Sequence, residues 1–247
     1  MPLLIISDIH SNLEALEAIL EDAHGLYTKI VCLGDIVGYG GDPNPVTDWV
    51  REHIPANDCV RGNHDRACTG NESLEYFNPA ARHSAIWTNE VLSDANRAYL
   101  ESLPRGPLRA EANGCPGFDM VHGSPTDEDE YLVSVADAKT QREALGVQLT
   151  WFGHTHVQGG FLLTPGGVRK IMPSMAFVME PDYYYLINPG SVGQPRDRDP
   201  RAAYALYSPE DRVISFRRVP YDIEGAAKKI RAAGLPEPLA TRLSQGV

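Results

Sequence analysis

Five short polar motifs between residues 8 and 156 carry the side chains that could do chemistry. Each motif follows a short apolar run, which predicts that each lies at the end of a strand. Loops at strand ends are where open α/β sheets place their ligands. The motifs are Asp8-Ile9-His10, Gly34-Asp35, Gly62-Asn63-His64-Asp65, Val121-His122-Gly123 and Gly153-His154-Thr155-His156.

The candidate metal ligands in these motifs are carboxylates, imidazoles and one amide. Such mixed donors suit first-row cations such as Mn, Fe, Zn or Ni, and no motif contains the cysteine typical of structural zinc sites. Asp8 and His10 lie two residues apart, so in an extended chain their side chains would point to the same face. His154 and His156 have the same spacing. Seven ligands are too many for one tetrahedral ion, so we expect two ions that share the central Asp35. The seven are Asp8, His10, Asp35, Asn63, His122, His154 and His156.

Short apolar runs and helical patterns predict the elements that position these motifs. Their order favours a layered α/β fold with two half-sheets and helices on the outer faces. There is no internal repeat and no low-complexity linker, so we expect a single domain over residues 1–247. Helices are expected at 13–23, with Asn12 as N-cap, and at 46–53, 79–92, 94–103, with Ser93 as N-cap, 135–145, 223–233 and 238–243. Strands are expected at 3–6, 29–33, 58–61, 108–112, 118–122, 149–152, 159–163, 168–171, 183–187, 202–207 and 213–217.

Composition excludes some classes of function. The chain has 247 residues, and 22 Lys and Arg against 33 Asp and Glu give a net charge of −11. This balance disfavours long nucleic acids and anionic membranes as partners, because both require clustered basic residues. The N-terminus does not resemble a signal peptide, no run is long enough to span a membrane, and the four cysteines form no CxxC pair. We therefore expect a cytoplasmic protein. Composition predicts nothing about its oligomeric state.

The order of the five motifs resembles the calcineurin-like metallophosphoesterase superfamily. A later block, NPGSVGQPR at residues 188–196, resembles the C-terminal loop of its small bacterial phosphodiesterase-type members. The resemblance implies a two-sheet αββα sandwich with a dinuclear metal site at the strand-end loops. It also implies a metal-dependent phosphoesterase that hydrolyses a small phosphodiester or phosphomonoester through a metal-bridging hydroxide, with manganese as the expected metal.

The resemblance further implies a role for each site residue. Asp35 would bridge the two ions and take part in catalysis. His64 would stay free of metal and act on the leaving-group oxygen as a general acid or a transition-state stabiliser; in an extended segment it would also point away from Asn63. The first ion would be held by Asp8, His10 and His156, and the second by Asn63, His122 and His154.

Substrate contacts and alternatives follow from nearby residues. Arg61, Arg66 and Arg196 are candidates to bind phosphate, although each could equally be a solvated surface residue. Gly38 and Tyr39 stand where the family's protein phosphatases carry Asp and Arg. A phosphoprotein phosphatase is therefore less expected, and a catalytically weak interaction module is the other alternative. The acidic run 127–130 is expected to be a solvated loop.

Overall fold

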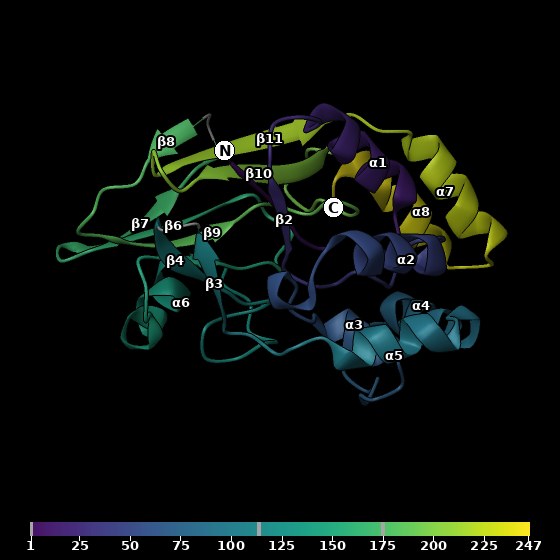
Figure 1. Ribbon diagram of the computed structural model, residues 1–247. Coiled ribbons are helices and arrows are strands. Elements are labelled where there is room, and N and C mark those ends of the chain that lie inside the picture. The colour runs from purple at the N-terminus through teal and green to yellow at the C-terminus, as the bar shows by residue number, and fades with distance from the viewer. Residues whose placement is uncertain (1, 113–114, 174–175) are drawn as a thin grey trace.

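The computed structural model describes residues 2–112, 115–173 and 176–247 (Figure 1). Its strands form two mixed sheets, as the sequence predicted. The first has the order β2 (Lys29–Cys32), β1 (Leu3–Ile6), β10 (Ala202–Ser208), β11 (Val213–Val219), β8 (Ala176–Val178). The second has the order β3 (Leu108–Ala112), β4 (Cys115–Met120), β5 (Leu149–Trp151), β9 (Tyr184–Asn188), β6 (Gly159–Thr164), β7 (Gly167–Ile171).

Parallel pairing brings the important strand ends together. Strand β1 runs parallel to β2, and β5 runs parallel to both β4 and β9. The two sets also meet across the sheets, because the amides of Val192 and Gly193, which follow β9, donate to the carbonyl oxygens of Ser7 and Asp8, which follow β1. The loops that follow these strands therefore converge at one edge of the molecule.

The apolar run of β1 is continuous because both of its faces are buried. Leu3 and Ile5 pack between the two sheets in a cluster that includes Trp151. Leu4 and Ile6 face the other way and belong to a cluster with Leu16 and other helical side chains. This alternation fixes the register of the strand, because a slip of one residue would exchange the two faces.

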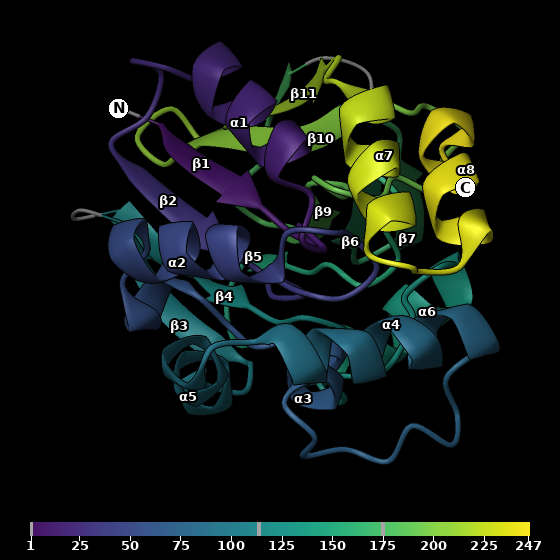
Figure 2. The same cartoon turned by 90° about the vertical axis from the view of Figure 1, so that its right-hand side faces the viewer.

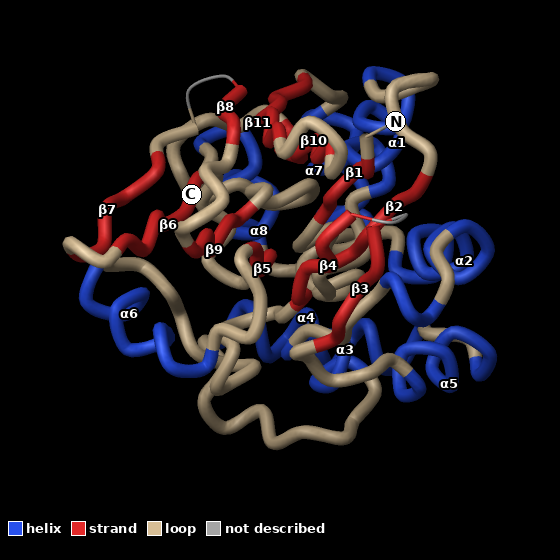
Figure 3. The backbone as a smooth tube through the Cα atoms, turned by 60° about the vertical axis from the view of Figure 1, so that its left-hand side comes forward, coloured by secondary structure: helices blue, strands red, loops and turns tan. Residues whose placement is uncertain are grey.

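Helices complete the outer layers and give the expected αββα sandwich (Figures 2 and 3). α1 contacts β10 and β11 on the outer face of the first sheet, α7 lies beside it, and α6 contacts β6 and β7 of the second sheet. The side chains of Asn12 and Ser93 cap α1 and α5, as predicted. The helices are α1 (Leu13–Asp22), α2 (Pro43–His53), α3 (Asn63–Cys68), α4 (Pro79–Val91), α5 (Asp94–Ser102), α6 (Val135–Thr140), α7 (Ile223–Ala232) and α8 (Glu237–Gln245), with short 3₁₀ turns at Ala56–Asp58 and Gln141–Ala144.

Some expected elements were wrong. The strand expected at 58–61 is replaced by a 3₁₀ turn and one isolated bridge between Cys32 and Cys59. α3 was not expected, nor was β8, and the helix expected at 135–145 divides into α6 and a 3₁₀ turn. Within the described ranges, no helix has the length and apolarity needed to cross a membrane.

Candidate metal centre

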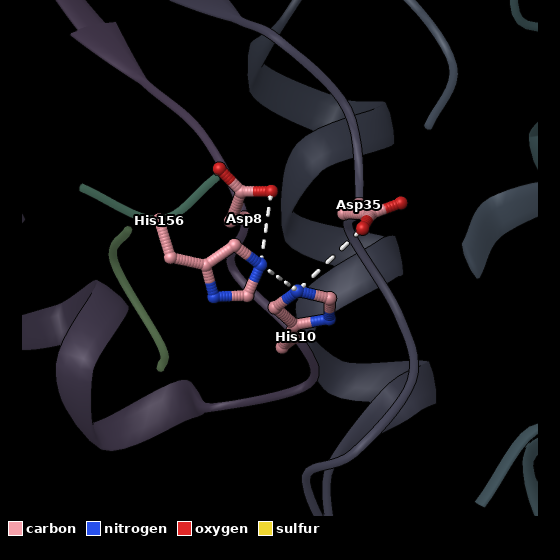
Figure 4. A group of neighbouring side chains, drawn as sticks. All are labelled: Asp8, His10, Asp35 and His156. Atoms are coloured by element: carbon pink, nitrogen blue, oxygen red, sulfur yellow. Dashed lines mark hydrogen bonds and ion pairs between the residues drawn. The ribbon is translucent and has the colours of Figure 1, made fainter. Parts of the chain in front are cut away.

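Four candidate ligands gather at the converging loops (Figure 4). Asp8 and His10 follow β1, Asp35 follows β2 and His156 follows β5. Nε2 of His10 lies 3.1 Å from Nε2 of His156 and 3.6 Å from Oδ2 of Asp35. Nε2 of His156 lies 3.4 Å from Oδ1 of Asp8. All four side chains are buried, so their donor atoms face one another rather than solvent.

A second group shares Asp35 with the first. Asp35, His122 and His154 each offer a ligand atom, and these atoms lie within 4.8 Å of one another. Nε2 of His122 is 3.4 Å from Oδ2 of Asp35 and 3.2 Å from Oδ1 of Asn63. All seven side chains that the sequence singled out as ligands therefore come together.

Backbone carbonyls fix the orientation of the imidazoles. Nδ1 of His10 lies 3.0 Å from the Val37 carbonyl oxygen, and Nδ1 of His156 lies 2.6 Å from that of Gln194. Nδ1 of His122 lies 2.8 Å from the carbonyl oxygen of Leu33. A ring that donates from Nδ1 keeps Nε2 unprotonated and available to a metal ion.

The donor set fits divalent transition metals. It combines imidazoles with carboxylates, and the described residues offer no hydrogen-bond partner to the buried Oδ2 atom of Asp8. A buried carboxylate oxygen without a partner is costly unless a cation compensates it. Burial raises the pKa of Asp8 to about 7, with the charge of Asp35 adding to the rise. Burial acts in the same direction on Asp35, but the imidazoles of His122 and His64 hold its pKa well below the usual range.

The ligands meet because the backbone turns sharply, and the expected extended geometry was wrong. Five of the seven ligands have left-handed backbone conformations, which cost on the order of 1–3 kcal/mol for a residue other than glycine. Such strain persists only where surrounding structure enforces it, and it is typical of functional sites. The φ values are 54° for Asp8, 50° for His10, 53° for Asp35, 63° for His154 and 58° for His156.

Asp65 holds the Asp35 loop in place, a role that the sequence analysis missed. Its carboxylate accepts hydrogen bonds from the amides of Asp35 at 2.9 Å, Ile36 at 2.8 Å and Gly62 at 2.8 Å. Gly62 is required beside it, because a Cβ atom there would lie 2.0 Å from Oδ1 of Asp35. The only signal in the sequence was an acidic residue at the end of the third motif.

Replacing Asp65 by asparagine should weaken metal binding by roughly 10–100-fold, the usual cost of losing a residue that orients ligands. The amide group would present N–H donors where the carboxylate now accepts from backbone N–H groups. Metal titration and thermal denaturation would measure both effects. Asp137→Asn is a matched control, since that carboxylate also accepts backbone hydrogen bonds, at α6. Equal metal affinity in the two variants would contradict this role for Asp65.

His64 is buried beside the two groups of ligands. It begins α3 together with Asn63, so the two side chains diverge by about 100° because the segment is helical, not because it is extended. Its ring lies 4.3 Å from that of Tyr39 and 5.0 Å from that of His10, and its Nδ1 atom has no hydrogen-bond partner among the described residues. Burial lowers the pKa of His64 to about 4, against the opposing charge of Asp35. A Cβ atom on Gly38 would lie 2.5 Å from Nδ1 of His64, so glycine makes room for the ring.

A cleft of about 320 Å³ opens beside Asn63, His64 and His154. Its walls include four aromatic side chains, Tyr39, Tyr76, Phe77 and Tyr131, and the sequence analysis connected only Tyr39 with the site. Tyr76 is 93% exposed, and the ring of Tyr131 lies 3.8 Å from that of His154. Aromatic residues in loops carry no periodic pattern, which is why the sequence did not reveal this wall.

The three candidate arginines have different surroundings. Arg61 and Arg66 both form ion pairs with Glu128, and Arg66 also pairs with Asp129 at 2.6 Å. Glu128 is only 9% exposed, so the expectation of a solvated acidic loop was wrong for this residue. Arg196 instead contacts the Tyr39 hydroxyl and the side-chain oxygen of Gln194, which leaves its positive charge uncompensated by these two partners.

Comparisons with known proteins identify the family of this chain. Residues 1–212 match the model of the calcineurin-like phosphoesterase superfamily domain. The chain is 39% identical to an uncharacterized protein from Methanocaldococcus jannaschii, over 98% of this chain and 97% of that protein. It is 42% identical to a metallophosphoesterase of known structure from Sphaerobacter thermophilus, with a TM-score of 0.84 over 100% of this chain and 99% of that one. A hypothetical protein from Pyrococcus horikoshii shares the fold, with 20% identity and a TM-score of 0.80 over 100% and 98% of the two chains.

Proposed function

This chain belongs to the calcineurin-like phosphoesterase superfamily, and we propose that it hydrolyses a small phosphodiester or phosphomonoester with two divalent metal ions. The observation that carries this proposal is the gathering of seven donors into two groups that share one carboxylate, Asp35. Two ions held about 3.5–4 Å apart would neutralise the phosphate and lower the pKa of a bound water towards ~7. That chemistry is what phosphoester hydrolysis requires.

We assign the ligands by their placement in the two groups. Asp35 would contact both ions, because its carboxylate lies near Nε2 of both His10 and His122. Manganese is the proposed metal, and Fe, Zn or Ni would also suit nitrogen and oxygen donors. One ion would be held by Asp8, His10 and His156, and the other by Asn63, His122 and His154.

The residues around the metals would bind and orient the ester. His64 borders the cleft beside Asn63 and His154, so we place its imidazole next to the leaving group. Arg196 is available to an anionic part of the substrate, whereas Arg61 and Arg66 could bind phosphate only by exchanging their carboxylate partners. The aromatic walls of the cleft favour a leaving group with an apolar or planar surface.

With Mn²⁺ added, the protein should hydrolyse bis(p-nitrophenyl) phosphate and should act poorly on phosphoserine peptides. The second expectation follows from Gly38 and Tyr39, which replace the Asp and Arg of the family's protein phosphatases. Rates on both substrates, with Mn, Ni, Zn and Mg compared, would test it. Removal of metal by a chelator should stop hydrolysis and reloading should restore it. Efficient dephosphorylation of the peptides without any diesterase activity would contradict the proposed substrate class.

A second candidate function is a metal-binding interaction module. An apolar pocket of about 200 Å³, lined in part by Leu132, Val133 and Phe161, lies beside the loop that carries His154, and Val133 is exposed. Such a surface is typical of protein contacts. A protein that holds two ions but hydrolyses none of the esters above would favour this alternative.

We also propose that residues 1–247 act as one domain and work in a reducing cytoplasm. α7 and α8 pack against Tyr39 and Ala81 in a shared apolar cluster, which supports one domain. The four cysteines are free, which suits a reducing compartment. The net charge of −11 supports a small substrate over a long nucleic acid.

A further inference from the structure

Two arginines from distant parts of the chain lie over one aromatic ring beside the metal centre. Arg196 belongs to the loop after β9, and Arg242 belongs to α8. Their guanidinium carbons lie 5.8 Å and 6.0 Å from the centre of the Tyr39 ring. Both also donate to Oε1 of Gln194, at 3.1 Å and 3.3 Å. The two positive charges are therefore held close together by shared neutral partners.

In the parts of the chain that the structure describes, Arg196 and Arg242 form no ion pair, and their side-chain hydrogen bonds go to the neutral Tyr39 and Gln194. Asp197 pairs with Arg218, and Asp199 pairs with Arg201. Among the residues that the structure describes, Nε of Arg196 and Nε2 of Gln194 are buried without hydrogen-bond partners. Burial, and then the charge of Arg196, lower the pKa of Arg242. Two neighbouring positive charges and buried N–H donors without acceptors are costly unless an anion binds between them.

The pair adjoins the first group of metal ligands. The amide of Arg196 donates to the carbonyl oxygen of His156 at 3.2 Å. The carbonyl oxygen of Gln194 accepts from Nδ1 of His156. The Tyr39 ring lies 4.7 Å from the ring of His10. A substrate whose phosphoryl group reached the metals could therefore extend another group over Tyr39 towards the arginines.

α8 is fixed against the loop that carries Arg196. Gly246 ends the helix with a φ of +65°, its carbonyl oxygen accepts from the amide of Arg198 at 2.8 Å, and a Cβ atom there would lie 2.9 Å from the Asp199 backbone. Leu239 and Leu243 are buried in the cluster that contains Tyr39. This helix lies beyond residue 212, where the match to the family model ends. The second arginine thus lies on a C-terminal helix outside the part of the chain that the family model matches (Figure 2).

We propose that Arg196 and Arg242 form a second anion site, which binds a second phosphate group of the substrate while the first lies at the metal centre. Guanidinium groups suit this task because their planar N–H donors match phosphate oxygens. The inference rests on the proposed function in so far as the ligand is a substrate. It narrows the substrate class to small esters with two phosphate groups.

Anion binding can be tested without metals or turnover. Metal-free protein should bind inorganic phosphate in a calorimetric titration, and Arg242→Gln or Arg196→Gln should weaken that binding by roughly 10–100-fold, the value of one charge-assisted hydrogen bond. Arg242→Lys should restore part of the affinity, because lysine keeps the positive charge but lacks the planar pair of N–H donors of a guanidinium group. Arg231→Gln is the matched control, since Arg231 lies in α7 and pairs with Glu237. Phosphate binding that is absent, or equal in all variants, would overturn the site.

Kinetics then distinguish a substrate site from a site for free phosphate. Alkanediol bisphosphates with two to six carbons between the phosphates should be compared with the matching monophosphates on the Mn-loaded protein. We expect at least one bisphosphate to have a KM about tenfold lower than its monophosphate, an advantage that Arg231→Gln keeps and Arg242→Gln removes. Equal KM values for every spacer would overturn the second-phosphate assignment. If no ester is hydrolysed while phosphate binding still depends on Arg242, the proposed function fails and the anion site stands.

Discussion

Replacing Asp35 by alanine should abolish nearly all hydrolysis and uncouple the binding of the two metal ions. Asp35 is the one carboxylate shared by both groups of ligands, with Oδ2 within 3.6 Å of Nε2 of His10 and 3.4 Å of Nε2 of His122. The loss of activity in Asp35→Ala should exceed the roughly 10–100-fold loss that follows removal of a residue that only orients a ligand. Elemental analysis, metal titration and kcat with bis(p-nitrophenyl) phosphate would measure the result.

Controls separate this effect from misfolding. Oδ1 of Asp35 also accepts the amide of His64, so Asp35→Asn keeps the shape and an acceptor while removing the charge. His156→Ala should mainly weaken one ion, because His156 belongs to only one of the two groups. Asp48→Ala makes the same change at an exposed ion pair and should alter neither metal content nor rate. Two tightly bound ions in Asp35→Ala would contradict the shared-carboxylate arrangement.

Replacing His64 by alanine should leave two metals bound and lower kcat by roughly 10²–10⁴-fold on esters with a poor leaving group. His64 lies beside the cleft, and all seven other candidate positions already supply the two groups of ligands. With p-nitrophenolate, which departs without a proton, the loss should be much smaller. Metal content and the rates on an alkyl and a nitrophenyl ester decide the matter.

The outcomes for His64 have distinct meanings. A variant that loses one metal would show that His64 is a ligand, against the role proposed here. Equal losses of rate on both esters would show that the imidazole stabilises phosphate charge rather than assisting departure of the leaving group. His83→Ala on the exposed face of α4 is the matched control and should keep both the metals and the rate.

The ligands and the two sheets could be predicted because their signals are local. Polar motifs after apolar runs mark strand ends, and parallel pairing of β1 with β2 and of β5 with its neighbours brings those ends together. The conformation of the motifs could not be predicted in this way. The left-handed backbones at Asp8 and His154 and the helix that begins at Asn63 are held by groups from other loops. The amide of Asp8 donates to the carbonyl oxygen of Gly34. The amides of His154 and His64 donate to the carboxylates of Asp8 and Asp35.

The sequence also could not predict which arginines are paired with carboxylates, because the partners are distant in the chain. Arg66 is adjacent to the third motif, but Glu72, Glu128 and Asp129 neutralise it, and two of these are about 60 residues away. Arg242 comes from the last helix, more than 200 residues from Tyr39 in the sequence, so no spacing rule links them. Charge compensation is decided by tertiary neighbours, which a linear pattern does not contain.

The scatter of the ligands along the chain, from Asp8 to His156, has a consequence for the order of assembly. Contacts between residues so far apart form late, because loop-closure entropy must be overcome first. In the unfolded chain only Asp8 with His10, and His154 with His156, are close together in sequence. We expect the left-handed turns at these residues to form only when both sheets are in place. We therefore expect metal ions to bind the folded protein rather than to direct its folding.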